Sequence, residues 1–235
     1  MLYIIGLGLD VLGISKYGLD IAKKCKKIYF ENYTVEFPYS LAGLGDIIGK
    51  KLFPADRGFV ESMKIIDEAK RTDVALLVYG SPLTATTHIT LIAEAKKSRV
   101  KVKTIYNASV VDAVAETGLQ PYKFGKIASM PGFDADSYTD IVADNLKIKA
   151  HSLILIDIGL NFEDALAKLE KDFNTKEINF NKIAVCSRLG TDSWKIYYGA
   201  IDELRGLEIK SPFCFVIPSE LHFIEKEVLE SFGVN

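Results

Sequence analysis

A run of five apolar residues, Val74–Val78, constrains the fold of this chain more than any other feature. A strand without alternating polar residues is typical of a parallel sheet that is covered by helices on both faces. Apolar residues at helical spacing precede the run in 58–71 and follow it in 86–97. The same alternation of apolar strands and amphipathic helices begins at 2–7 and continues to 100–106. The sequence therefore predicts an α/β fold with a parallel-rich sheet.

The second half of the chain also alternates strands with helices, so we expect two α/β lobes, 1–108 and 109–235. A ligand cleft is expected between two such lobes. Ser15 and Ser219 stand where helix N-caps are expected. The predicted strands are 2–7, 28–30, 74–78, 100–106, 127–130, 153–158, 183–187, 194–198 and 213–217, and the predicted helices are 16–24, 40–50, 58–71, 86–97, 109–117, 138–147, 162–173 and 219–232.

Composition excludes several classes of protein. Lys and Arg number 29 against 31 Asp and Glu in 235 residues, which argues against a basic nucleic-acid-binding protein. No apolar run approaches the ~18 residues of a membrane helix, and the N-terminus reads as a strand and not as a signal peptide. Three cysteines without C-x-x-C spacing predict reduced thiols in a cytoplasmic protein. Three scattered histidines give no metal-ligand pattern, so we expect no metal.

Small residues follow the first predicted strand as Gly6-x-Gly8. This pattern lets a backbone approach a ligand closely, although it also fits a plain turn. Val11 stands where a dinucleotide-binding loop would carry its third glycine, and the next helix starts too late to face a pyrophosphate. A nicotinamide site is therefore a poor fit, even though Glu31 resembles a ribose-binding acid.

The segment Gly80–His88 is the most informative loop, because it follows the buried strand at the sheet edge where α/β proteins bind ligands. Hydroxyl residues crowd the predicted helix start, a place that suits an anion. The alternative is a strand–turn–helix connection with Thr86 as a cap. His88 in the first helical turn is more often a packed residue than a catalyst. Asn107–Val110 repeats the arrangement after the next strand, and there Ser109 is either a ligand contact or an N-cap.

Together these segments resemble the methyltransferases of the tetrapyrrole-methylase-like family. Two strings resemble those of the branch of this family that acts in diphthamide synthesis; they are Ala85-Thr86-Thr87-His88 and Tyr122-Lys123-Phe124-Gly125. The matching segments keep the family's order over nearly the whole chain; they are 2–9, 31–34, 80–88, 108–110, 118–125, 217–218 and 221–222.

The resemblance implies two α/β lobes that bind S-adenosylmethionine in their cleft. It implies a homodimer that methylates the amino group of a modified histidine on elongation factor 2, with no membrane or nucleic-acid partner. Transfer of a methyl group from a sulfonium needs alignment more than an acid or a base, so we name no catalytic residue. The family's cofactor contacts carry over to Leu9, Ser81, Thr84, Ser109, Val110, Ile156, Leu189 and Phe213.

This sequence departs from the family pattern at Ser81, where an aspartate is expected, and at Ser219-Glu220, where Gly-Lys is expected. Two alternatives stay open. The chain is another methylase of the same family, acting on a tetrapyrrole or an RNA, or it is a non-catalytic binding module in which Ser81 marks a decayed site.

Overall fold

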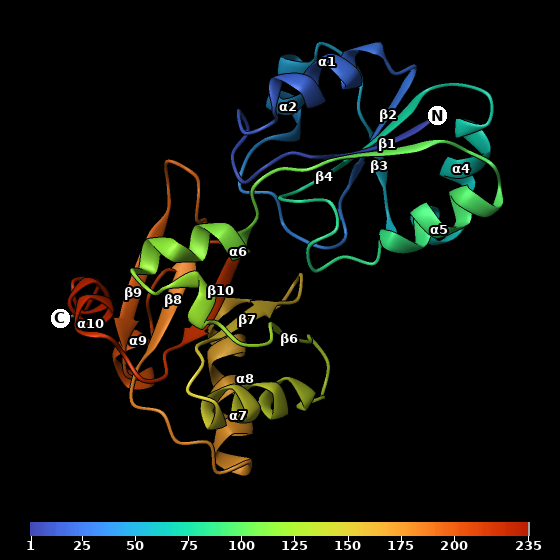
Figure 1. The fold of residues 1–235 in the computed structure, drawn as a ribbon. Helices are drawn as coiled ribbons and strands as arrows, with labels where there is room; N and C mark the ends of the chain where they lie inside the picture. Colours follow the sequence, from blue (N-terminus) through green and yellow to red (C-terminus); the bar gives the residue numbers. More distant parts are fainter. Residues whose placement is uncertain (235) are drawn as a thin grey trace. The chain divides into compact units, whose positions relative to one another are not determined.

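The computed structural model describes residues 1–234 and divides into two compact units, Met1–Val110 and a second unit from Val111 onward. Each unit is built around its own five-stranded sheet with its own core (Figure 1). Within residues 1–234, no helix is both long and apolar enough to cross a membrane.

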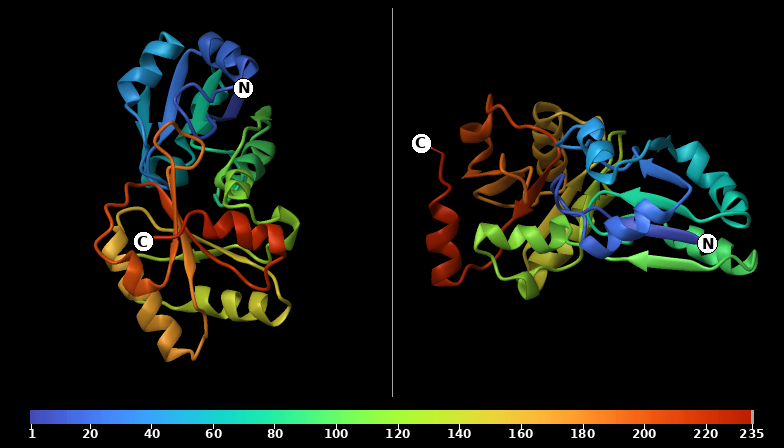
Figure 2. Two further views of the ribbon diagram at one scale, coloured as in Figure 1. Left: turned by 90° about the vertical axis from the view of Figure 1, so that its left-hand side faces the viewer. Right: turned by 90° about the horizontal axis from the view of Figure 1, so that it is seen from above.

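The first unit has a parallel sheet in the order β3-β2-β4-β1-β5. Figures 1 and 2 show its helices on both faces, with α1 and α2 over one core and α4 and α5 over the other. All residues of β4 are buried, as the apolar run predicts. The elements are β1 Leu2–Gly6, α1 Lys16–Lys24, β2 Lys27–Glu31, α2 Leu41–Ile48, β3 Phe53–Ala55, α3 Arg57–Glu61, α4 Lys64–Ala69, β4 Val74–Val78, α5 Ile89–Lys97 and β5 Val102–Ile105.

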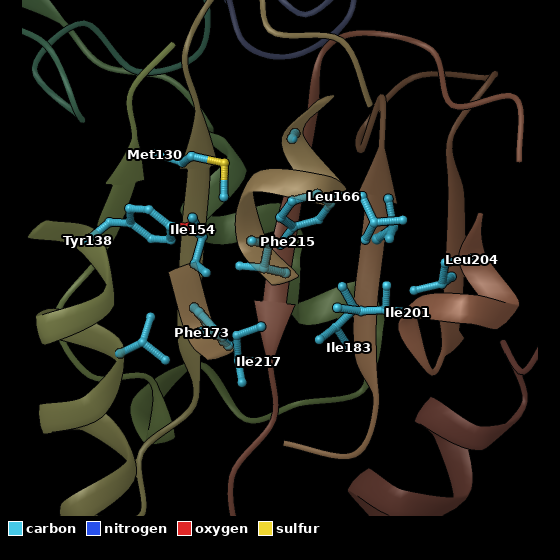
Figure 3. Packing of buried hydrophobic residues seen from close by; sticks show 14 of the residues in the cluster. Met130, Tyr138, Ile154, Leu166, Phe173, Ile183, Ile201, Leu204, Phe215 and Ile217 are labelled. Atoms are coloured by element: carbon cyan, nitrogen blue, oxygen red, sulfur yellow. The ribbon is translucent and has the colours of Figure 1, made fainter. Parts of the chain in front are cut away.

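The second unit has a mixed sheet in the order β6-β7-β10-β8-β9, in which only β6 and β7 pair in parallel. Phe215 on the central strand and Phe173 on α8 belong to the core that this sheet forms with its helices (Figure 3). The elements are α6 Val110–Ala113, η1 Val114–Thr117, η2 Pro121–Lys123, β6 Ala128–Met130, α7 Ser137–Lys147, β7 Ser152–Ile156, α8 Phe162–Thr175, β8 Ile183–Ser187, β9 Lys195–Gly199, α9 Ile201–Leu204, β10 Phe213–Ile217 and α10 Phe223–Glu230.

Several predicted helices differ from the structure. The helix expected at 58–71 is broken into α3 and α4, because Met63 adopts a left-handed conformation with φ 58°. The helix expected at 109–117 is α6 followed by the 3-10 turn η1, and Gly118 ends it with φ 82°. A Cβ on Gly118 would lie 2.4 Å from Val228 Cγ1, so no side chain fits there.

The closing helix begins at Phe223 with His222 at its N-cap, so the prediction of Ser219 as the cap is wrong. The reason is tertiary. The Ser219 N–H donates to His151 Nδ1 over 2.9 Å, and the Glu220 carbonyl accepts from Lys123 Nζ over 2.9 Å. These bonds hold the residues after β10 outside the helix.

A buried carboxylate connects the string 118–125 to α10. Glu225 is 1% exposed, and its carboxylate accepts hydrogen bonds from the backbone of Gln120 and His222 and from the side chains of Lys123 and His151. We refer to these five residues as the Glu225 network. The Tyr122-Lys123-Phe124-Gly125 string of the sequence analysis therefore has a structural role in the second unit.

The charge state of the Glu225 network follows from its donors. His151 Nδ1 accepts the Ser219 N–H, so the proton of the neutral ring lies on Nε2 and points to Glu225 over 3.3 Å. Burial lowers the pKa of His151 below 6.5 although Glu225 opposes this shift. Burial by itself would raise the pKa of Glu225, but its hydrogen bonds from Lys123, His222, Gln120 and His151 hold that pKa at about 2. The network thus contains a carboxylate, a neutral imidazole and the Lys123 ammonium.

We expect the protein to lose stability on acidification in two steps. As pH falls below 6.5, the unfolded chain takes up a proton at His151 before the folded chain does. As pH falls from 4.5 toward 2, the unfolded chain likewise protonates Glu225 first. This second step removes roughly 3 kcal/mol of stability. Urea unfolding at pH 7, 5 and 2 measures the two losses, and equal free energies of unfolding at all three values would contradict the prediction.

Candidate active site

Three loops meet at the carboxyl edge of the first sheet. Gly8, after β1, pairs with Gly80, after β4, through backbone bonds of 2.9 and 3.2 Å. The Asn107 side-chain amide, after β5, donates to the carbonyls of Gly6 over 3.1 Å and of Gly13 over 2.9 Å. The loops after β1, β4 and β5 therefore converge within the first unit.

Glycine is required where these loops touch. A Cβ on Gly6 would lie 2.6 Å from the Gly80 carbonyl oxygen and 3.0 Å from Asn107 Cβ. Gly8 and Gly80 adopt φ values of 73° and 69°, which side chains rarely adopt. The Gly6-x-Gly8 pattern thus allows close contact between the backbones of two loops, and the approach of a ligand to this pattern stays a prediction.

Five of the predicted cofactor contacts lie on these loops. The Leu9 carbonyl accepts from the Tyr79 hydroxyl over 3.0 Å, which ties it to the start of the second loop. Thr84 N–H donates to the Ser81 carbonyl over 3.2 Å. A Cβ on Gly80 would lie 3.6 Å from Ser109 Cα, so the second loop packs against the third, in which Val110 follows Ser109.

The other three predicted contacts share one edge of the second sheet. Ile156 is the last residue of β7, and Phe213 is the first residue of β10, which runs antiparallel to it. Leu189 follows β8, just after Arg188, whose N–H donates to the Pro212 carbonyl over 2.8 Å. The antiparallel pairing of β10 with β7 and β8 therefore places Ile156, Leu189 and Phe213 at the same end of the second sheet.

The loop after β4 departs from the expected helix start. Residues 81–88 form turns, and α5 begins at Ile89, so His88 precedes the helix and does not lie in its first turn. The Pro82 carbonyl explains this path, because it accepts from the Thr86 hydroxyl over 2.9 Å and contacts His88 Nδ1 over 3.1 Å. Ala85 lies in the left-handed region with φ 54°, which also interrupts a helix.

The carboxylate of Glu31 is buried and accepts hydrogen bonds from neighbouring residues of the protein. Glu31 is 1% exposed, and its carboxylate accepts from the N–H groups of Tyr33 and Thr34 over 2.7 and 2.8 Å. The Thr34 hydroxyl donates to the same carboxylate. These contacts define a turn after β2 and leave Glu31 as a structural residue, in agreement with the poor fit to a nicotinamide site.

Asn107 and Tyr33 hold the loops together, although the sequence analysis placed them only within segments and not among the cofactor contacts. Asn107 joins the first and third loops, and the Tyr33 hydroxyl lies 3.4 Å from His88 Nε2. The signal was present in the strings 31–34 and 85–88, which meet in the fold. No group of three or more His, Cys, Asp or Glu side chains in the described part of the chain is arranged to hold a metal ion.

Residues 1–205 match the family described as Tetrapyrrole (Corrin/Porphyrin) Methylases. The chain therefore belongs to the tetrapyrrole methylase family and is a methyltransferase, which confirms the resemblance inferred from the sequence. It is 37% identical over 254 residues to the diphthine synthase of Methanococcus maripaludis, with both chains covered completely. It is 32% identical over 269 residues to the diphthine methyl ester synthase of Schizosaccharomyces pombe, covering 100% of this chain and 95% of that one. A crystal structure of a diphthine synthase superposes with a TM-score of 0.91 at 29% identity, covering 99% of this chain and 95% of that one.

Proposed function

We propose that this protein uses S-adenosylmethionine to methylate the amino group of a modified histidine on elongation factor 2, a step of diphthamide synthesis. The observation that carries the proposal is the convergence of the loops after β1, β4 and β5, which brings together the positions expected to bind the cofactor. Full-length similarity to diphthine synthases supports the choice of acceptor. We also propose a cytoplasmic homodimer, as the family resemblance implies.

The residues on the loops fit S-adenosylmethionine. Ser81, Thr84 and Ser109 carry neutral hydroxyls, which can both donate to a carboxylate and accept from an ammonium or ribose hydroxyl. Leu9 is 7% exposed and adds an apolar side chain to these loops. Ile156, Leu189 and Phe213 are the proposed contacts from the second unit. When bound, S-adenosylmethionine supplies an electrophilic methyl group on a positively charged sulfur.

The role that we assign to these residues is binding and alignment. Close packing of the loops around Gly6 fixes their positions, and a fixed position is what an in-line displacement requires. The acceptor amine attacks in its neutral form, and its proton can leave to solvent. No side chain is needed as a general base in this proposal.

To test the function, elongation factor 2 that carries the precursor modification is incubated with this protein and S-adenosylmethionine. Mass spectrometry then measures the methyl groups that have been added to it. Addition of methyl groups that survive mild alkali supports amine methylation. A further methyl group that mild alkali removes would indicate an ester, the product in the names of the 32–35% identical relatives. An unmodified substrate, with binding of the cofactor intact, would favour another acceptor, such as a tetrapyrrole or an RNA. Absence of cofactor binding would favour a binding module with a decayed site.

Replacing Ser81 with aspartate is expected to strengthen cofactor binding about fivefold, or about 1 kcal/mol. S-adenosylmethionine carries a sulfonium and an ammonium, and a carboxylate at ~4 Å attracts a cation by about 4 kcal/mol at an effective dielectric near 20. Ser81 is 9% exposed, so desolvation of the new carboxylate cancels much of that attraction.

Calorimetric titration with S-adenosylmethionine measures the effect of Ser81→Asp, and Ser81→Asn is the matched control because it has the same shape without the charge. Equal or weaker binding by Ser81→Asp than by the natural protein would contradict the prediction. It would mean that neutral groups of this site already do what the family's carboxylate does.

A further inference from the structure

The contacts of His88 determine which of its ring nitrogens carries the proton. The ring is fully buried, and Nδ1 lies 3.1 Å from the Pro82 carbonyl oxygen, which can only accept. In the neutral ring the proton is therefore on Nδ1, and Nε2 is an acceptor. The Tyr33 hydroxyl lies 3.4 Å from Nε2 and is the group that can donate to it. One side chain thus bonds to the loop after β4 with one nitrogen and to the turn after β2 with the other.

The turn that carries Tyr33 is itself rigidly held. The buried Glu31 carboxylate accepts both N–H groups of the turn and the Thr34 hydroxyl. The Arg57 guanidinium lies 5.4 Å from the centre of the Tyr33 ring, where a cation–π contact is favourable. The Tyr33 and His88 rings meet edge to face with centroids 6.4 Å apart. Burial raises the pKa of Tyr33, which keeps its hydroxyl protonated as a donor.

The loop that His88 contacts, residues 81–88, contains no helix or strand that would fix its path, and we refer to it as the cofactor loop. Residues 81–88 form turns, with Ala85 in the left-handed region, and they carry two of the proposed cofactor contacts, Ser81 and Thr84. Pro82 lies two residues after Gly80, which pairs with Gly8 of the first loop, and is part of the turns that lead to α5. A bond to the Pro82 carbonyl therefore acts on the part of the loop that carries Ser81 and Thr84.

We propose that His88 is a positioning residue, which uses its Nδ1–H form to fasten the cofactor loop to the Tyr33 turn and so sets the affinity for S-adenosylmethionine. The inference rests on the proposed function for its ligand, but the fastening itself is a property of the protein alone. His88 does not touch the reacting atoms in this proposal, because its ring is buried and both nitrogens are engaged within the protein.

Three variants separate the two bonds of the ring. His88→Asn places an amide N–H near the position of Nδ1 and keeps the bond to Pro82. His88→Gln places its amide near Nε2 and loses that bond. Tyr33→Phe removes only the hydroxyl. His222→Gln is the control, because His222 is an exposed histidine at the N-cap of α10 in the second unit.

Hydrogen exchange of the protein without ligand tests the fastening, and titration with S-adenosylhomocysteine tests its consequence. We expect faster exchange at residues 83–88 in His88→Gln, with an affinity about tenfold lower. His88→Asn keeps the Pro82 bond but loses the Tyr33 bond, so we expect it to rescue only in part, with a few-fold loss of affinity like that of Tyr33→Phe. In methyl-transfer assays the KM for S-adenosylmethionine rises while kcat is nearly unchanged, since binding and not chemistry is affected. Nitrogen NMR should detect the His88 proton on Nδ1, with the Nε2 resonance shifted in Tyr33→Phe.

Unchanged exchange at residues 83–88 in both His88→Gln and Tyr33→Phe would overturn the inference, whatever the cofactor result. So would faster exchange with unchanged affinity. If His88→Gln does not fold, Tyr33→Phe decides the question, because unchanged exchange at residues 83–88 in that variant would by itself overturn the inference. A natural protein that binds no S-adenosylhomocysteine would instead contradict the proposed function, and the exchange data would still decide whether His88 fastens the loop.

Discussion

Replacement of Glu225 with alanine is expected to lower the free energy of unfolding by about 3–5 kcal/mol, the usual cost of removing one partner from a buried charged network. The variant leaves the buried His151 Nε2–H and the backbone N–H groups of Gln120 and His222 without their acceptor. Lys123 also loses its buried partner. Because domains are stable by only about 5–15 kcal/mol, this loss is a large part of the total.

Urea unfolding of the Glu225→Ala variant measures this effect. Glu227→Ala on the same helix is the matched control, since Glu227 is exposed. We expect Glu227→Ala to change the free energy of unfolding by less than about 0.5 kcal/mol. A Glu225→Ala variant that is as stable as this control would show that the network contributes nothing to stability.

Replacement of Gly6 with alanine is expected to weaken cofactor binding by at least about tenfold and to cost about 1–3 kcal/mol of stability. The new Cβ would lie 2.6 Å from the Gly80 carbonyl oxygen and 2.9 Å from Pro82 Cδ. The carbonyl is backbone and cannot rotate away, so the loop that carries Ser81 and Thr84 has to move. Titration with S-adenosylhomocysteine and thermal unfolding measure the two effects.

Gly43→Ala is the matched control for Gly6→Ala. Gly43 lies in α2, and a Cβ there would meet no atom within 4 Å. This control should raise stability by about 0.5–1 kcal/mol, because glycine is disfavoured inside helices, and it should leave binding unchanged. Normal cofactor affinity in Gly6→Ala would mean that the packing of the loops does not control the site.

The elements that depend on local pattern could be predicted from the sequence. The apolar run Val74–Val78 is a fully buried parallel strand, and the Phe213–Ile217 strand has its predicted bounds. Ser15 caps the helix 16–24 by accepting from the Gly18 N–H. These features follow from side-chain periodicity and from capping between neighbours, so the information for each lies within a few residues.

The placement of loops at a common edge could also be predicted from the sequence, since parallel strands end on the same side of their sheet. The glycines after β1 and β4 and the segment Asn107–Val110 all follow strands of this sheet, and contacts at Gly6 and Gly80 join these segments. The resemblance to the methylase family supplied the particular site residues, which no local pattern could have selected.

Only the tertiary structure decided which residues that are distant in the sequence form hydrogen bonds with one another. His88 binds Tyr33, and His151 binds Glu225, across 55 and 74 positions of sequence. A third remote contact, from the Ser219 N–H to His151 Nδ1 across 68 positions, explains why Ser219 is not a helix cap, whereas the start of α5 after His88 follows from the local bonds of the Pro82 carbonyl. The physical reason is that a local pattern gives a residue's preference, whereas a buried hydrogen bond from a remote segment is strong enough to override that preference.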